Sequence, residues 1–261
     1  MVKNFKIRFT KSQDLIEADS PKVSTINVYE KIYDTHAIVE SIAMSVGEGG
    51  DSVGKAELDA LLLAGLKEDS RVFDFGCGTG RLTQFLAPYL KSGQYFGSDI
   101  SSEMLKILES QLGKMSNVNL YHQVEYLFPE LPQKVDFIAA FSVFTHMEPE
   151  DTYCYLKSMH DLCTDHTQLV VSILDIDSNL GQLVFRNQAS IPFGKRWNAV
   201  RNFVTSAEYF LGIANLAGWS LKHWITDSNQ EFTPFSSAKE NYHFGQSIAV
   251  MTPAIIGNLE Q

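Results

Sequence analysis

The segment that carries the most structural information reads Val72-Phe73-Asp74-Phe75-Gly76-Cys77-Gly78-Thr79-Gly80-Arg81. The apolar run at 71–75 predicts a short buried strand, and the residues after the last glycine repeat their apolar positions at helical spacing. Three glycines at alternate positions therefore lie in a turn between a strand and a helix. Glycine permits positive φ and lets a ligand approach the backbone where a Cβ would obstruct it. The helix that follows offers N–H groups and a partial positive charge to an anionic group.

The rest of the chain continues this alternation of strands and helices. Ser101 and Pro149 mark helix starts, as an N-cap and a first-turn proline, and Gly218 marks a helix end. Six further strands are expected, at 95–100, 118–123, 135–143, 168–174, 219–225 and 246–251. The pattern predicts an α/β fold, with a doubly wound, mostly parallel seven-stranded sheet covered by helices on both faces.

The fold pattern also suggests domain boundaries. Residues 1–54 are expected to form an N-terminal arm and helical extension, and 55–251 the main domain, which opens with a helix at 56–66. Periodicity fades between 175 and 204, where glycine, proline and aromatic residues predict a lid-like insertion. A capping box at Thr205-Ser206-Ala207-Glu208 resumes the regular pattern. Residues 252–261 are expected to form a C-terminal tail.

Composition and charge argue against several classes of protein. The 261 residues carry a formal net charge of −10 and contain no cluster of four or more Lys or Arg, so no nucleic-acid partner is expected. The chain lacks both a run of about 18 apolar residues and a secretory signal, so no membrane span is expected. Its three cysteines (Cys77, Cys154 and Cys163) form no metal-ligand spacing. A cytoplasmic protein is the expectation.

Spacing within the glycine turn separates two classes of cofactor. A dinucleotide-binding turn has the pattern Gly-x-Gly-x-x-Gly, and its third glycine would fall where this chain has Arg81. The observed pattern is Gly-x-Gly-x-Gly, with Asp74 two residues before the first glycine. It resembles motif I of the class I S-adenosylmethionine (SAM)-dependent methyltransferases. The resemblance extends over residues 55–251 and implies SAM as the cofactor and S-adenosylhomocysteine (SAH) as the product.

The resemblance also implies which residues surround the cofactor. Asp99 closes the second strand, where these enzymes place the acid that accepts hydrogen bonds from both ribose hydroxyls. Met104 matches an apolar residue near the adenine, and Gln123 lies where the adenine is commonly recognised, with Glu125 as the alternative if the register slips. In these enzymes the exit of the fourth strand usually holds the methionine amino group through main-chain oxygens, and the resemblance implies the same here. The expected cofactor-binding residues are Asp74, Gly76, Cys77, Gly78, Gly80, Asp99, Ile100, Met104, Gln123 and Phe141.

Two histidines are candidates for a general base. His146 follows the fourth strand, where an acceptor would meet the methyl group, although capping of that loop is an alternative role. His243, in the loop before the last strand, is the second candidate. Metal-dependent relatives place acidic ligands just after the fourth strand. This chain has Phe141-Ser142-Val143-Phe144 there, so no metal is expected.

Aromatic residues in the insertion and in the loop before the last strand predict an apolar acceptor pocket, and they are Phe185, Phe193, Trp197, Phe203, Phe232, Phe235 and Tyr242. The implied function is direct in-line methyl transfer to a small or medium organic acceptor, or to an apolar carrier-bound one, with an O, N or C acceptor atom left open. Alternatives are a non-catalytic SAM-binding protein, an NAD(P)-dependent oxidoreductase on a related fold, and a SAM-using enzyme of other chemistry. A tight strand–helix turn without a ligand is the structural alternative.

Overall fold

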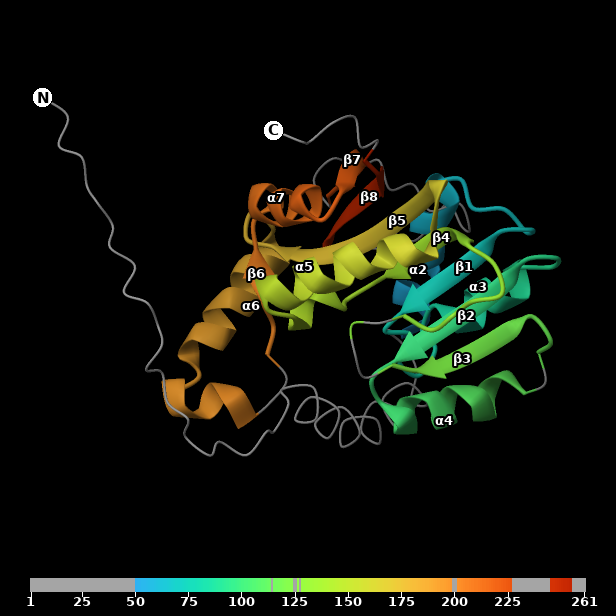
Figure 1. The fold of residues 1–261 in the computed structure, drawn as a ribbon. Coiled ribbons are helices and arrows are strands. Elements are labelled where there is room, and N and C mark those ends of the chain that lie inside the picture. The colour runs from blue at the N-terminus through green and yellow to red at the C-terminus, as the bar shows by residue number, and fades with distance from the viewer. Residues whose placement is uncertain are drawn as a thin grey trace, which may run out of the picture.

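A computed structural model describes residues 50–113, 115–123, 126, 128–198, 201–226 and 245–254. Its strands are β1 (Arg71–Phe75), β2 (Gln94–Asp99), β3 (Val118–His122), β4 (Val135–Ala140), β5 (Cys163–Asp175), β6 (Val204–Thr205), β7 (Trp219–Ile225) and β8 (Ser247–Pro253). Seven of them form one sheet in the order β3-β2-β1-β4-β5-β8-β7, and the two-residue β6 pairs with the end of β5 (Figure 1). The pairs among β1 to β5 are parallel, whereas β8 runs antiparallel to β5 and to β7. The predicted seven-stranded, mostly parallel sheet is confirmed.

Helices cover both faces of this sheet. They are α2 (Gly50–Leu63), α3 (Thr83–Tyr89), α4 (Ser102–Leu112), α5 (Pro149–Ser158), α6 (Asn179–Ser190) and α7 (Ala207–Leu216). One apolar layer joins α2, α3 and α4 to the sheet, and the other joins α5 and α7 to the opposite face. Successive β1 residues, Val72 and Phe73, point into different layers, as the two-residue period of a strand requires.

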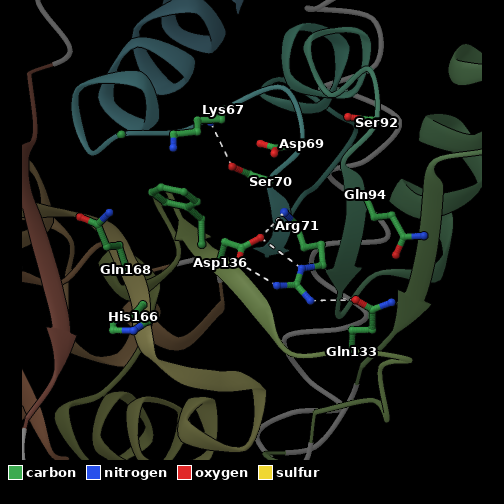
Figure 2. A pocket seen from close by; sticks show the side chains of 12 residues that line it. Lys67, Asp69, Ser70, Arg71, Ser92, Gln94, Gln133, Asp136, His166 and Gln168 are labelled. Atoms are coloured by element: carbon green, nitrogen blue, oxygen red, sulfur yellow. Dashed lines mark hydrogen bonds and ion pairs between the residues drawn. The ribbon is translucent and has the colours of Figure 1, made fainter.

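The two edges of the parallel strands differ in chemistry. At the amino ends of β1, β2 and β4 lies a polar cavity of about 600 Å³ (Figure 2). The guanidinium of Arg71 crosses it, donating to Asp136 through Nη2 at 2.9 Å and to Gln133 through Nη1 at 2.8 Å. Arg71 and Asp136 therefore neutralise each other within the cavity. The glycine turn follows the carboxyl end of β1 and so lies at the opposite edge of the sheet.

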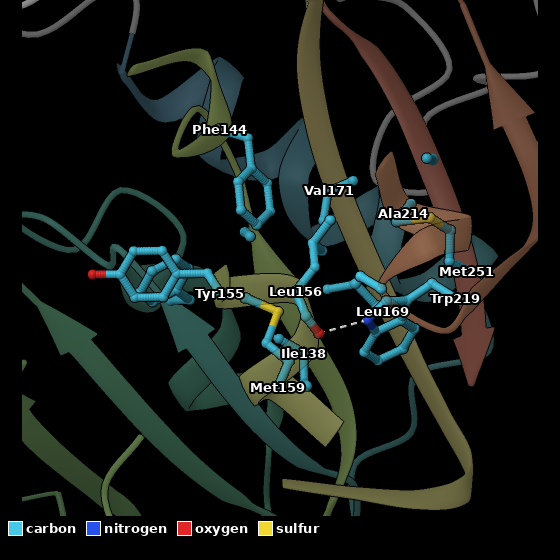
Figure 3. Close-up of a cluster of buried hydrophobic side chains, with 14 of the residues drawn as sticks. Ile138, Phe144, Tyr155, Leu156, Met159, Leu169, Val171, Ala214, Trp219 and Met251 are labelled. Atoms are coloured by element: carbon cyan, nitrogen blue, oxygen red, sulfur yellow. Dashed lines mark hydrogen bonds between the residues drawn. The ribbon is translucent and has the colours of Figure 1, made fainter. Parts of the chain in front are cut away.

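The apolar core under α5 and α7 packs against β4, β5, β7 and β8 (Figure 3). Trp219, which is 1% exposed, donates from Nε1 to the carbonyl of Leu156 at 2.8 Å, so its one polar atom is satisfied in an apolar surrounding. The ring of His160 stacks on it with a centroid distance of 4.6 Å. These contacts join the start of β7 to the end of α5.

Most of the local signals act where the sequence places them. Ser101 caps α4 by accepting from the Met104 N–H, Pro149 begins α5, and Gly218 follows α7 with φ +89°. The capping-box expectation is wrong by one residue, because Ser206, not Thr205, caps α7 and accepts from the Tyr209 N–H. The helix expected at 56–66 begins at Gly50.

The segment at 175–204, in which periodicity fades, contains a regular helix. Its residues form α6 and the 3₁₀ helix η3 (Phe193–Asn198). Ser178 caps α6 by accepting from the Gly181 N–H, and Gly181 is the only buried residue of that helix. A helix that buries so little has no reason to carry an apolar stripe, which explains why the periodicity gave no indication of it. In Figure 1, α6 and η3 project from the body of the sheet.

Candidate cofactor site

The glycine turn adopts a conformation that requires glycine. Gly76, Gly78 and Gly80 have φ values of +74°, +55° and +97°, all in the left-handed region. A Cβ at Gly76 would lie 2.5 Å from Val143 Cγ2, and one at Gly80 would lie 2.3 Å from Leu108 Cδ1. At Gly78 the nearest atom would be Met104 Sδ, at 3.9 Å. The turn is thus packed tightly at Gly76 and Gly80 and less tightly at Gly78.

The end of β2 holds the turn in place. The N–H groups of Gly76 and Cys77 both donate to the carbonyl of Ser98, at 2.8 and 2.9 Å. Asp99 accepts from the Gly78 N–H through Oδ2 and from the Ser101 N–H through Oδ1, both at 2.8 Å. A carboxylate oxygen can accept more than one hydrogen bond, so an acid at this position can both shape the turn and accept from a ligand hydroxyl.

Four N–H groups of the turn are engaged within the protein. Those of Gly76, Cys77 and Gly78 donate to the end of β2, and that of Gly80 donates to the Cys77 carbonyl at 3.0 Å. The sequence expectation concerned the N–H groups at the start of the following helix, which these four bonds do not test.

Asp74 supports the turn through buried hydrogen bonds. Its side chain is 3% exposed and accepts from the hydroxyl of Tyr95 at 2.7 Å, while the Tyr95 oxygen lies 2.7 Å from Thr83 Oγ1. The pKa of Asp74 is raised to about 7. Burial raises it most, and the negative charges of Glu57 and Asp99 add to this, whereas the Tyr95 hydrogen bond and the charge of Arg81 lower it. The carboxyl group ties β1 to β2 and α3 instead of facing solvent.

An ion pair that the sequence analysis missed lies next to the turn. Glu57 of α2 is 1% exposed, and its Oε1 accepts from Arg81 Nε at 3.0 Å and from Arg81 Nη2 at 2.5 Å. Burial raises the pKa of Glu57, and the charge and hydrogen bond of Arg81 lower it. The signal in the sequence was a carboxylate beside Ala56, Ala60 and Leu61, on the apolar face of a helix.

The exit of β4 is strained and held by side chains from distant segments. Ser142 has φ +59°, which is unusual for a residue with a Cβ. Its N–H donates to Ser172 Oγ at 2.8 Å, the Ser172 hydroxyl donates to Gln246 Oε1 at 2.7 Å, and Gln246 Nε2 donates to Ser142 Oγ at 3.0 Å. Arg81 Nη2 lies 3.4 Å from the same Ser142 hydroxyl. Strained backbone of this kind clusters at functional sites.

His146 lies at the same edge of the sheet, in the 3₁₀ helix η1 (Phe144–His146) after β4. Its Nδ1 lies 2.9 Å from the carbonyl of Arg201, and the neighbouring Thr145 carbonyl accepts from the Phe203 N–H. Because a carbonyl only accepts, Nδ1 carries the hydrogen and Nε2 carries a lone pair. Burial lowers the pKa of His146, which keeps the ring neutral at pH 7.

The remaining predicted residues are placed as follows. Met104 and Gln123 are buried near the end of β2, where the Gln123 N–H donates to the Asp99 carbonyl at 3.0 Å. Ile100 accepts from His122 through its carbonyl, and Phe141 is buried at the exit of β4. His243, Glu125, Phe232, Phe235 and Tyr242 lie outside the described residues, as does the side chain of Trp197.

The described part of the chain gives two further limits. No group of three or more His, Cys, Asp or Glu side chains within it is arranged to hold a metal ion. None of its helices has the length and apolar character needed to cross a membrane.

Comparison with known proteins agrees with the geometry. Residues 72–166 match the family model described as a methyltransferase domain. Magnesium protoporphyrin IX methyltransferase from Synechocystis PCC 6803, solved with bound SAH, aligns with a TM-score of 0.60 and 17% identity over 88% of this chain and 100% of its own. A methyltransferase in calicheamicin biosynthesis, also solved with SAH, aligns with a TM-score of 0.57 and 17% identity, over 88% of this chain and 61% of its own.

A SAM-dependent methyltransferase from Clostridium acetobutylicum ATCC 824 aligns with a TM-score of 0.55 and 14% identity, over 85% of this chain and 99% of its own. At these identities the solved structures establish a shared fold, and the family model covers the glycine turn, Asp99 and His146. Fold, motif and family model agree: residues 72–166 match a methyltransferase domain, and the chain shares the fold of solved SAM-dependent methyltransferases.

Proposed function

We propose that this chain binds SAM at the glycine turn and transfers its methyl group to a small or medium organic acceptor, leaving SAH. The observation that carries the proposal is the pairing of three positive-φ glycines with Asp99 at the end of the neighbouring strand. Two structural neighbours, by their names, act on a porphyrin and in the biosynthesis of a natural product, which supports a small acceptor. The net charge of −10 counts against a nucleic-acid acceptor.

The described residues suit the parts of this cofactor. Asp99 is the proposed acceptor for the ribose hydroxyls, and the backbone at Gly78, next to Met104, is the proposed surface for the flat nucleoside. Gln123 is the proposed contact to the adenine. Asp74 acts through the turn that it braces. The three cysteines, all free thiols, suit the reducing cytoplasm, which is the proposed location.

SAM supplies a methyl group on a positively charged sulfur, so the protein mainly has to align the acceptor. An acceptor that loses a proton during attack also needs a base. We assign this role to His146, because its Nδ1–H is held by the Arg201 carbonyl and its Nε2 lone pair is the proton acceptor. The lowered pKa of His146 favours the neutral form that a base requires.

Two assays test the proposal. Purified protein is incubated with SAM and a panel of phenols, carboxylic acids and amines, and SAH and methylated product are measured by mass spectrometry. Methylation of a panel member is the expected result. Transfer to tRNA or DNA with none to small molecules would contradict the proposed acceptor class, and heat stabilisation by NADH but not by SAM would favour an oxidoreductase. SAM binding without transfer to any acceptor would favour a non-catalytic binding protein.

The role of His146 has its own readout. His146→Gln keeps a side chain of similar length but removes the base, so kcat for a protic acceptor should fall about 100-fold or more while SAM affinity stays unchanged. The acidic limb of the kcat–pH profile should disappear with it. A His146→Gln protein that retains both rate and profile would remove this residue from the proposal.

A further inference from the structure

Arg81 occupies the place in the turn where a dinucleotide-binding protein has its third glycine. The strand order β2–β1–β4 puts Asp99 on one side of the turn and Ser142 on the other. A SAM molecule whose ribose lies at Asp99 therefore extends its methionine end across β1 towards Ser142. Arg81 Nη2 lies 3.4 Å from the Ser142 hydroxyl, so the guanidinium lies on the methionine side.

The guanidinium is fixed on one edge. Nε and Nη2 both donate to Glu57 Oε1. The Glu57 carboxylate is buried on α2, and Arg81 is its only counterion among the described residues. Gly54 of the same helix packs against the Arg81 carbonyl, where an added Cβ would lie 2.2 Å from the oxygen. Helix α2 thus holds both the backbone and the side chain of Arg81.

The other edge of the guanidinium makes no hydrogen bond to the described residues. The Arg81 side chain is 36% exposed, and Nη1 has no hydrogen bond to any of the described residues. An arginine held by one carboxylate can receive a second on its remaining N–H groups, because its fork is planar and carries five donors. The methionine end of SAM carries such a carboxylate, and four N–H groups of the turn are already engaged.

We propose that Arg81 binds the carboxylate of the methionine end of SAM through its Nη1 edge, and that Glu57 is the positioning residue that holds the guanidinium for this contact. The inference rests on the proposed function and adds to it a specific recognition site for the amino-acid end of the cofactor. It also gives a reason for an arginine at position 81. A glycine there would satisfy the turn but would leave the carboxylate without a cation.

The direct test compares two ligands that differ only in this carboxylate, SAM and decarboxylated SAM, by isothermal titration calorimetry. Wild-type protein should bind SAM about 10- to 100-fold more tightly than decarboxylated SAM, the range of a charge-assisted hydrogen bond. Arg81→Gln should lose this preference by weakening SAM alone, with the affinity for decarboxylated SAM unchanged. Such a coupling between side chain and carboxylate distinguishes contact from a general loosening of the turn.

Three further variants sharpen the result. Arg81→Lys keeps the charge without the fork and should retain part of the preference. Glu57→Gln, which frees the guanidinium, should reduce the preference without abolishing it. Arg71→Gln is the matched control, because Arg71 lies at the opposite edge of the sheet against Asp136, and it should leave both affinities unchanged. Melting temperatures establish that each variant is folded.

The outcomes separate this inference from the proposed function. Equal weakening of both ligands by Arg81→Gln would make Arg81 a structural clamp and overturn the inference, and so would no weakening of either. Wild-type protein that binds the two ligands with equal affinity would overturn it as well, while leaving the proposed function standing. Wild-type protein that binds neither ligand would overturn both.

Discussion

At the scale of single residues, Asp74 shows how the turn depends on a buried acid. Its carboxyl group lies among Tyr95, Thr83 and the other carboxylates of the site, with Arg81 as the nearby positive charge. In the folded protein the pKa of Asp74 is therefore about 7, whereas its ordinary value is 3.8. A proton held more tightly in the folded state stabilises that state.

Asp74→Asn tests this linkage. Asp74 loses its proton near pH 4 when the chain is unfolded but only near pH 7 when it is folded, so its contribution to stability is complete below about pH 4 and lost as pH rises to 7. The free energy of unfolding of wild type should fall over this window, and that of Asp74→Asn should fall less. Urea unfolding at several pH values measures the difference, with exposed Asp69→Asn as the control. Identical slopes for Asp74→Asn and wild type would contradict the buried, protonated acid.

Gly76 carries a second prediction at this scale. Gly76→Ala forces a Cβ to 2.5 Å from Val143 Cγ2 at φ +74°, so it should destabilise the fold by about 2–4 kcal/mol through both strain and overlap. Gly113→Ala, at φ +61° and ψ −145°, meets nothing within 4 Å and should cost the backbone strain alone, about 1–3 kcal/mol. Val143→Ala should recover part of the loss at Gly76. A Gly76→Ala/Val143→Ala double variant that recovers nothing would show that overlap with Val143 plays no part.

At the scale of elements, α6 packs closely against the end of β5 at Gly181. A Cβ at Gly181 would lie 1.8 Å from the Asp175 carbonyl oxygen, so this helix can pack against the end of β5 only with glycine there. Helix α6 is thereby joined to the carboxyl ends of the parallel strands, where the glycine turn also lies. Its geometry depends on this residue far more than on any apolar stripe.

Gly181→Ala should detach α6 and lower the free energy of unfolding by about 1–3 kcal/mol, with faster proteolysis between 176 and 204. The matched control is Gly212→Ala in α7, where nothing lies within 4 Å and alanine should stabilise the helix by about 0.5–1 kcal/mol. Thermal unfolding and limited trypsin digestion measure both. Unchanged proteolysis between residues 176 and 204 in Gly181→Ala would contradict this attachment.

Elements with a periodic apolar pattern were predictable from the sequence, and elements without one were not. The buried run at β1 and the Ser101 cap of α4 act locally, so the chain itself specifies them. Helix α6 has neither an apolar stripe nor much burial, and its cap Ser178 alone did not identify it. Thr205 and Ser206 are both good caps, and only the backbone decides between them.

At the scale of the whole molecule, the parallel strands collect the site at one edge. The glycine turn, Asp99 and the exit of β4 all follow carboxyl ends of strands. The fold could be predicted from the motif and is confirmed, and residues 72–166 match a methyltransferase domain. The hydrogen bonds that join Ser142, Ser172 and Gln246 could not be predicted, because Gln246 lies 104 residues from Ser142 and no local pattern indicates the contact. The Glu57–Arg81 pair was missed for the same reason.

The most direct test of the account is calorimetric titration of the folded protein with SAM and SAH, for wild type and Asp99→Asn. Wild type should bind both at a single site. Asp99→Asn has one oxygen instead of two for the Gly78 and Ser101 N–H groups and the ribose, so it should bind about 10- to 100-fold more weakly at a similar melting temperature. A folded wild-type protein that gives no heat with either ligand, or an Asp99→Asn variant that binds as wild type does, would contradict the placement of the cofactor at this turn.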